Sequence, residues 1–320
     1  MVLKRSLAFI LVSLLVEEIK CLWKKQLDMF DRSDDNPPIP SFLRLVLAVE
    51  CSVVFAAGVL LFFLPALAAG LWPWNIPPFN SRFIGAIYLA AYLPLILFWS
   101  VPRWKPGRLT LWMILTFTTL VLITMLIHWD AFEWSRLSTY LVFWPLYIFL
   151  PINSTIFLLR SKGAGSAKGY DGPALLRILL MIFALLGAAY GLGLLIAPEP
   201  LTRFWPWPVD AFHARMYAAA FVTPAVGAWI LSFRRRVPSE YLSFGLNLVA
   251  GGFLPILGTL WTNSQVPAER QVDFGAGGTW LFFIFFSLTG IFGILVTALA
   301  FQLSKKAPVT HSEFQIQSPR

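Results

Sequence analysis

Two short segments with the same residues are the most distinctive feature of this sequence. Trp72-Pro73-Trp74 is followed eight residues later by Arg82, and Trp205-Pro206-Trp207 is followed at the same interval by Arg215. We expect each arginine in the first turn of a helix, where a cation is disfavoured by about 0.3–1 kcal/mol and needs a compensating partner. Either each guanidinium stacks on a nearby tryptophan or donates to loop carbonyls, or the two together bind an anionic lipid head or substrate.

A carboxylate inside an apolar run is the second candidate. Glu50 is the only charge within the apolar runs of the first half of the chain, and Thr116, Thr119 and Asn153 are expected at a similar depth on neighbouring helices. A buried carboxyl of this kind is functional by default. The alternative is a protonated side chain that bonds between helices or leans to the interface. The equivalent position in the second half is Phe183.

Histidines and cysteines complete the candidate groups. His128 and His213 are both expected at outer helix ends, where two imidazoles can hold a haem, but no CxxCH motif accompanies them and ordinary interfacial histidines are favoured. Cys21 and Cys51 are thirty residues apart and lack the spacing of a metal site. No HExxH or GxSxG motif is present, so we expect neither a cofactor nor a metal and assign no catalytic residue.

The composition indicates a membrane protein. Of 320 residues, 58% are hydrophobic and 13% are charged, whereas soluble domains are roughly 45–50% apolar and about 25% charged. Apolar runs of about 20 residues, the length that crosses a hydrocarbon core, recur along the chain. They predict an all-α integral membrane bundle of about eight transmembrane helices, over residues 43–65, 83–101, 109–128, 139–159, 175–196, 215–233, 242–261 and 280–302.

The basic residues predict the orientation of these helices. The net charge is +9, and all but five of the 25 Lys and Arg residues fall on the side of the amino terminus. This distribution follows the positive-inside rule and predicts that both termini are cytoplasmic, in the cell (inner) membrane. The charge therefore indicates contact with anionic lipid and no nucleic-acid partner. The five residues on the opposite side are Arg82, Arg136, Arg203, Arg215 and Arg270.

The first 41 residues form a separate cytoplasmic segment. Lys4-Arg5 and the apolar run after them resemble a signal peptide, but Glu17-Glu18 occupy the place of small cleavage-site residues, so we expect the segment to be retained. Apolar residues at helical spacing with lysines between them predict an interfacial amphipathic helix over residues 3–31. A ninth spanning helix is the alternative, and the ten-residue length of its apolar run disfavours it.

An offset of 133 residues aligns the two halves of the chain. It superposes the two Trp-Pro-Trp segments and their arginines, and also Gly58 on Gly191 and Pro65 on Pro198. Such coincidences indicate a fused duplication, and because each copy crosses four times the copies are parallel. We therefore divide the chain into a cytoplasmic segment 1–41, a first four-helix repeat 42–160, a cytoplasmic linker 161–174, a second repeat 175–303 and a cytoplasmic tail 304–320.

Each repeat resembles the four-helix unit of DoxX-like membrane proteins, in which a Pro-ended first helix is followed by a loop and by a second helix that opens with Arg and small residues. Uncharacterised bacterial multi-pass membrane families share this order. The resemblance implies a membrane subunit associated with partner proteins or with quinones, and it carries over no catalytic residue.

These observations predict a non-enzymatic multi-pass membrane subunit or binding module. Its ligand would be a lipid, a quinone or a protein partner, held at an extracytoplasmic surface made by Trp72, Trp74, Arg82, Trp205, Trp207 and Arg215. The alternative is a small-solute or proton-coupled transporter that uses Glu50. An enzyme of lipid or isoprenoid chemistry ranks third, because the convergent acids, histidines or metal ligands that such chemistry needs are not found in the sequence.

Overall fold

The computed structural model describes residues 36–161, 172–233 and 237–305. Apart from one isolated β-bridge between Pro38 and Arg103, the regular elements in these ranges are all helices. Eight of them are long and apolar enough to cross a membrane. The predicted all-α bundle with eight spanning helices is therefore confirmed. The predicted amphipathic helix over residues 3–31 and most of the predicted linker and tail lie outside the described residues.

The spanning helices lie within a few residues of the predicted runs, except where a proline or a cap begins them earlier. They are α2 (Ser41–Phe63), α4 (Pro78–Ser100), α5 (Trp104–Ile127), α6 (Trp144–Arg160), α7 (Ala174–Ile196), α9 (Ala211–Ser232), α10 (Pro238–Asn263) and α11 (Gly277–Lys305). Short helices join them: α3 (Pro65–Leu71), α8 (Pro198–Thr202), the 3₁₀ turns η1 (Trp129–Ala131) and η3 (Ala268–Arg270), and the π-helical turn η2 (Ser138–Phe143) that leads into α6.

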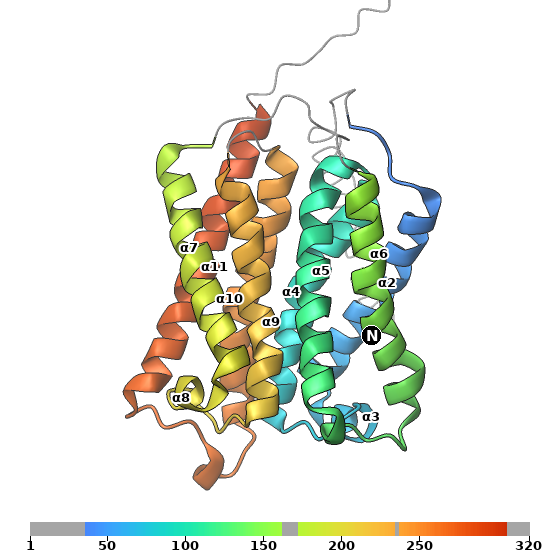
Figure 1. Ribbon diagram of the computed structural model, residues 1–320. Helices are drawn as coiled ribbons and strands as arrows, with labels where there is room; N and C mark the ends of the chain where they lie inside the picture. Colours follow the sequence, from blue (N-terminus) through green and yellow to red (C-terminus); the bar gives the residue numbers. More distant parts are fainter. Residues whose placement is uncertain (1–35, 162–171, 234–236, 306–320) are drawn as a thin grey trace, which may run out of the picture.

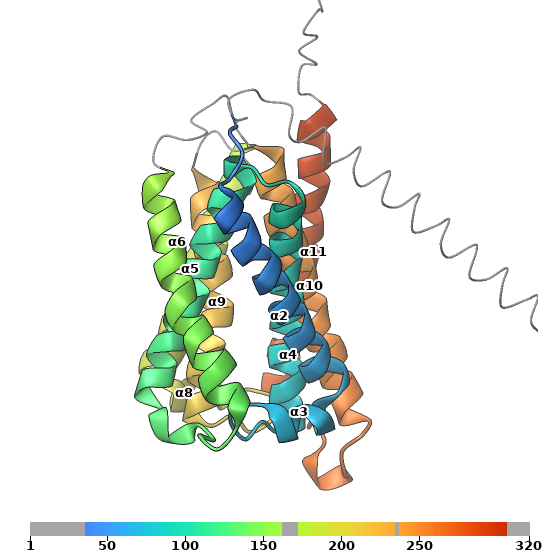
Figure 2. The same ribbon diagram turned by 90° about the vertical axis from the view of Figure 1, so that its right-hand side faces the viewer.

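The eight spanning helices form two layers of four. One layer runs in the order α7, α9, α5, α6, and the other runs α11, α10, α4, α2, because neighbours within a layer make the most extensive contacts. Figure 2 shows the layers side by side, and Figure 1 shows the second half of the chain on the left and the first half on the right. Each layer thus takes two helices from each half of the sequence. The two halves meet where α4 packs on α10 and where α5 packs on α9.

The two ends of the bundle differ in what they carry. Residues 161 and 172 and residues 233 and 237, which flank the undescribed stretches, lie at the end drawn at the top of Figure 1, and we call this the linker end. The short helices α3 and α8 lie at the opposite end with both Trp-Pro-Trp segments, and we call this the Trp-Pro-Trp end.

Burial follows position in the layers. The central helix α9 is the most buried of the eight, whereas the outer helices α7 and α11 are the least. The outward faces carry large apolar side chains such as Leu185, Leu186 and Leu288, each about three-fifths exposed or more. Apolar side chains in such numbers are stable only against lipid, so the pattern fits a bundle whose perimeter faces a bilayer.

Two helix starts differ from the sequence expectation in a way that bears on the arginines. Pro78 occupies the first turn of α4, where a missing amide N–H costs nothing, and Asp210 caps α9 by accepting the backbone N–H of His213 at 2.9 Å. Both helices therefore begin four residues before their arginine. Arg82 and Arg215 lie in the second turn, not in the first turn as predicted, and their side chains enter the bundle.

Candidate functional site

Arg82 is fully enclosed at the Trp-Pro-Trp end. Its side chain is only 2% exposed, and its Nε donates to the carbonyl oxygen of Phe62 at 3.1 Å. Its two terminal nitrogens donate to Oγ1 of Thr262 at 2.9 Å and to Oε1 of Gln265 at 2.6 Å. The guanidinium also lies over the ring of Trp261, 4.5 Å from its centroid. Burial lowers the tendency of any cation to stay charged, and these partners offset that cost within the chain.

Arg215 makes the equivalent contacts 133 residues later. Its Nε donates to the carbonyl oxygen of Leu195 at 3.0 Å, which is again the residue twenty positions before the arginine. Its Nη1 lies 2.8 Å from Nε2 of His128 at the end of α5. An arginine side chain only donates, so Nε2 of His128 is the acceptor and the proton of this neutral ring is on Nδ1. His128 and Trp261 thus contact the two arginines from the third helix of the opposite half.

These contacts favour the bracing interpretation of the arginines. Each guanidinium holds the carbonyl end of the helix before it and reaches across to the other half of the chain. The two arginines share no contact residue among their printed partners, which for Arg82 come from α2 and the end of α10 and for Arg215 from α7 and the end of α5.

The Trp-Pro-Trp tryptophans point inward. Trp72, Trp74 and Trp207 are 7%, 2% and 5% exposed, and Trp205 is half-buried. They therefore do not form the exposed surface that the sequence suggested, because the loops fold under the bundle and insert their rings between the layers. In each half the pair packs on a phenylalanine of the fourth helix segment, with Trp74 5.1 Å from Phe143 and Trp207 5.3 Å from Phe282.

Ring contacts also cross between the halves. Phe212 meets Trp74 edge-on at 5.3 Å, and the equivalent Phe79 stacks on Trp207 at 5.3 Å. The indole N–H of Trp207 donates to Asn80 at 2.8 Å, whereas the indole nitrogens of Trp72 and Trp74 have no hydrogen-bond partner. Their surroundings are aromatic, so weak N–H···π contacts are the interactions left to them. The Trp-Pro-Trp end is an aromatic core that joins the two halves.

His213 is held by the residue that caps its helix. Its Nδ1 lies 2.6 Å from Oδ2 of Asp210, and its Nε2 is buried without a hydrogen-bond partner. Burial alone would raise the pKa of the Asp210 carboxyl, but hydrogen bonds from the His213 ring and backbone dominate and bring the pKa to about 2. Each candidate haem ligand is therefore engaged with a neighbour. No group of three or more potential metal ligands occurs among the described residues.

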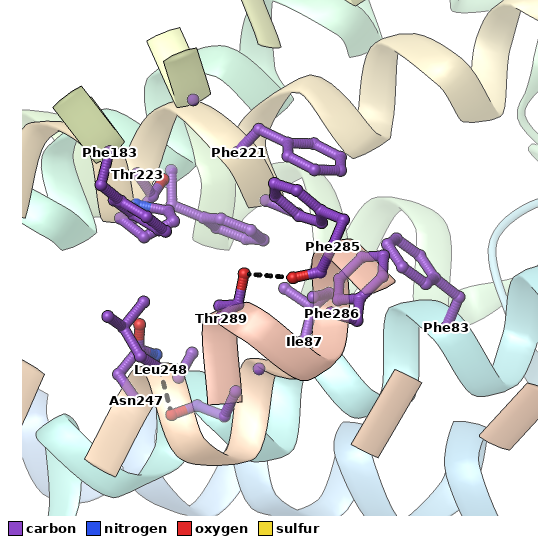
Figure 3. Close-up of a pocket in the computed structure, with 17 residues that line it drawn as sticks. Phe83, Ile87, Phe183, Phe221, Thr223, Asn247, Leu248, Phe285, Phe286 and Thr289 are labelled. Carbon is purple, nitrogen blue, oxygen red and sulfur yellow. Dashed lines mark hydrogen bonds between the residues drawn. The ribbon is translucent and has the colours of Figure 1, made fainter. Parts of the chain in front are cut away.

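Interior cavities lie between the layers in the middle of the bundle. One of about 70 Å³ lies toward the second half of the chain and is lined mainly by phenylalanine rings, including Phe83, Phe183 and Phe286. Figure 3 shows these rings around the open space, with Thr223 and Asn247 on its polar side. A void this size is several times the 10–15 Å³ that one water requires.

A second cavity of about 70 Å³ lies toward the first half and contains Glu50. The two cavities share Ala91, Phe117, Thr223 and Asn247, and a smaller one of about 30 Å³ beneath Trp74 shares Phe117 with both. The space between the layers therefore extends from Glu50 toward the Trp-Pro-Trp end. Glu50 and Phe183, which occupy equivalent positions in the two halves, line equivalent cavities.

The polar groups around the Glu50 cavity come from five helices. The hydroxyls of Tyr88 and Tyr147 are hydrogen-bonded to each other at 2.6 Å, whereas Oγ1 of Thr223 is buried without a partner. Asn247 donates to the carbonyl of Ala90 at 3.0 Å. That carbonyl is free because Pro94, four residues later, has no N–H to bond it. A proline in α4 and an asparagine in α10 thus meet at the wall of the cavity.

The structure brings only part of the predicted polar layer together. Glu50 is 5% exposed and faces the cavity, but Thr116 and Thr119 are outside its lining, and the neighbouring Thr118 and Thr110 line it instead. Asn153 is buried in α6 and is also outside the lining. Sequence reasoning missed Tyr88, Tyr147, Thr223 and Asn247. Two tyrosines within apolar helices were the available signal, because a buried tyrosine hydroxyl needs a partner.

Comparison of the chain with protein-family models, with curated proteins and with solved structures finds no match. The functional argument therefore rests on the residues and their geometry alone.

Proposed function

We propose that this protein is a non-enzymatic membrane binding protein that holds a small amphiphile between its two helix layers. The cavity that contains Glu50 carries the proposal, since it lies at the middle of the spanning helices and combines an apolar lining with a few polar groups. Ligand sites in proteins typically have this composition. The lipid or quinone expected from the sequence fits such a site better than it fits the Trp-Pro-Trp end, where the arginines and indoles are engaged with one another.

Contacts repeated at equivalent positions support a fused duplication of one four-helix unit. The arginine bonds to Phe62 and Leu195 are equivalent, as are the ring pairs of Phe143 and Phe282 with their tryptophans. The spacing between equivalents is one residue shorter at Phe143/Phe282 than at Thr139/Thr279. The π-helical turn η2 absorbs that residue, because a π turn holds more residues than an α turn.

We further propose that the protein lies in the cell (inner) membrane with the linker end in the cytoplasm. The basic residues next to the linker end and the few at the Trp-Pro-Trp end support this orientation. The resemblance of each repeat to DoxX-like units adds a proposed partner, a membrane-complex subunit bound at the lipid-facing perimeter.

Blocking the cavity tests the binding proposal. Ala91 lines both large cavities, so Ala91→Leu fills space in each without adding a polar group. Ala56→Leu on the exposed face of α2 adds the same atoms outside the cavities and serves as the control. We expect native mass spectrometry in mild detergent to find a bound small molecule on the parent and on Ala56→Leu and not on Ala91→Leu. An identical bound mass on all three would contradict a ligand in the cavity.

A proton-coupled transporter is the second candidate, and the position of Glu50 favours it. The carboxyl lies within the bundle without a hydrogen-bond or ion-pair partner among the described residues, as a proton-carrying group requires. Glu50→Gln should then leave folding intact and abolish proton-coupled flux. Unchanged flux in reconstituted vesicles would return Glu50 to a binding or structural role.

A further inference from the structure

The Glu50 cavity lacks a counter-charge. Its carboxyl is 5% exposed, and no hydrogen bond or ion pair to it exists among the described residues. The sixteen lining residues include no lysine, arginine or histidine. An ionised carboxylate in such surroundings is strongly disfavoured unless a cation is paired with it. The chain supplies no such cation, so a bound molecule that carries a positive charge would complete the site.

Aromatic rings surround the place that the charge would occupy. Tyr88, Phe117 and Tyr147 line the same cavity as Glu50. The two tyrosine hydroxyls are bonded to each other at 2.6 Å and are not needed for the ligand. Ring faces attract a cation through the ring quadrupole, and the attraction reaches about 2 kcal/mol or more where water is excluded. A carboxylate with three aromatic rings is therefore suited to an organic ammonium group and poorly suited to an anion.

The rest of the lining fits an apolar body. Val54, Leu95, Ile114 and Leu150 belong to four different helices and surround the cavity with aliphatic groups. The cavity also continues past Phe117 into the phenylalanine-lined space of the second half. A hydrophobic group attached to the ammonium can extend in that direction. At the equivalent position in the second half Phe183 replaces the carboxylate, so each chain has one such site.

We propose that the Glu50 cavity binds a lipophilic cation, namely an amine or quaternary ammonium with an apolar body. The Glu50 carboxylate is its counter-ion, and Tyr88, Phe117 and Tyr147 enclose the charged group. This assignment rests on the proposed binding function and specifies the polar group of the ligand as a cation. A quinone or a neutral lipid head, which offers acceptor oxygens and no charge, would leave the carboxylate unpaired.

A matched pair of probes separates charge from shape. Phenylbutylamine is ionised at neutral pH, as a lysine amine is, while phenylbutanol has a similar size and no charge. Calorimetric titration of the purified full chain in neutral detergent should show the amine binding at least about tenfold tighter than the alcohol, a difference of about 1.4 kcal/mol. Glu50→Gln should abolish that preference. Glu133→Gln, which neutralises an exposed carboxylate at the opposite end, should keep it.

The outcomes distinguish this inference from the function on which it rests. If Ala91→Leu removes binding of both probes while Glu50→Gln leaves the preference for the amine unchanged, the cavity binds ligands but the cation assignment is wrong. If a short-chain ubiquinone binds the parent and the amine does not, the assignment is also wrong. If no probe binds the parent, both proposals fail. Should Glu50→Gln not fold, Glu50→Asp, which keeps the carboxylate, must retain the preference for the amine.

Discussion

Arg215 and His128 form a hydrogen bond that requires a neutral histidine. Nη1 of Arg215 lies 2.8 Å from Nε2 of His128, at the point where α9 of one half meets the end of α5 of the other. Burial and then the charge of Arg215 lower the pKa of His128, while the more distant Asp210 raises it by a smaller amount. The bond therefore connects the two halves only as long as the ring is unprotonated.

Acidification should weaken this connection. Because the pKa of His128 is lower in the folded chain than its unfolded value of about 6.5, the unfolded state binds the proton more readily. The resulting stability is fully present above pH 6.5 or so and is lost as the pH falls toward the lower folded pKa. We expect the melting temperature of the purified protein to fall as the pH is lowered through this window.

His128→Gln is the matched control for that measurement. Its amide oxygen can accept the proton of Arg215 and does not titrate. Asp210, with a pKa of about 2, stays ionised throughout and adds no slope in this range. A melting temperature that falls equally with pH in the parent and in His128→Gln would show that the Arg215–His128 bond is not the sensitive element.

Two adjacent glycines of α10 should respond oppositely to alanine. A Cβ at Gly252 would lie 2.5 Å from the Cα of Gly290 and 2.6 Å from the carbonyl oxygen of Phe286, because α10 and α11 approach backbone to backbone there. At Gly251 the nearest atom would be Cβ of Ala90, at an unstrained 3.7 Å. Gly252→Ala should cost about 1–3 kcal/mol through overpacking. Gly251→Ala should be neutral or stabilise by up to about 1 kcal/mol through helix propensity.

Thermal unfolding of the two glycine variants in the same detergent checks this packing. The change in composition is identical, so the variants differ only in which face of α10 receives the methyl group. A Gly252→Ala variant as stable as Gly251→Ala would contradict the close approach of α10 and α11.

The sequence was sufficient for the helices because their physical causes are local. Apolar runs of spanning length and prolines at helix starts fix where each crossing begins, and all eight were predicted within a few residues apart from the earlier starts of α4 and α9. The inward direction of the Trp-Pro-Trp rings was not predictable in this way. A tryptophan at the membrane interface and one packed under the bundle have the same local sequence, and only the contact with Phe143 or Phe282 separates them.

The polar layer failed at the level of helix rotation. Thr116 and Thr118 are two residues apart, so they point to faces of α5 that differ by about 200° at 3.6 residues per turn. A depth estimate alone cannot choose between them. The partners from the other half, Thr223 and Asn247, could not be found either, because the layered packing that places them beside Glu50 is a property of the whole bundle.

Orientation in the membrane can be measured by cysteine labelling. In a background with Cys21→Ser and Cys51→Ala, we expect an impermeant maleimide added to intact cells to label Ala268→Cys, which is exposed near the Trp-Pro-Trp end. It should not label Gly165→Cys, which follows the linker end. Labelling of both after the cells are opened confirms that each thiol is reactive. Labelling of Gly165→Cys in intact cells would reverse the proposed topology.

The arginine pair allows a test of whether Arg82 and Arg215 act separately. Arg82→Gln removes bonds to Phe62, Thr262 and Gln265, and a hydrogen bond made by a charged group contributes about 1.5–3 kcal/mol. Arg215→Gln loses fewer contacts, so it should lower the melting temperature less. Because the two arginines have different partners, the losses should add in the double variant to within about 0.5 kcal/mol. Arg203→Gln, an exposed arginine at the same end, should change little.

The competing hypothesis is that both arginines hold one anionic or quinone-like ligand, and it predicts a different pattern. Either single substitution would then remove most of the ligand's stabilisation, and the second would add little. The deciding measurement is the melting shift produced by phosphatidylglycerol and by a short-chain ubiquinone on the parent, both single variants and the double variant. Additive losses with equal shifts in all four proteins are the result expected from the enclosed contacts of Arg82. A ligand-dependent shift that disappears in both single variants would establish a shared site instead.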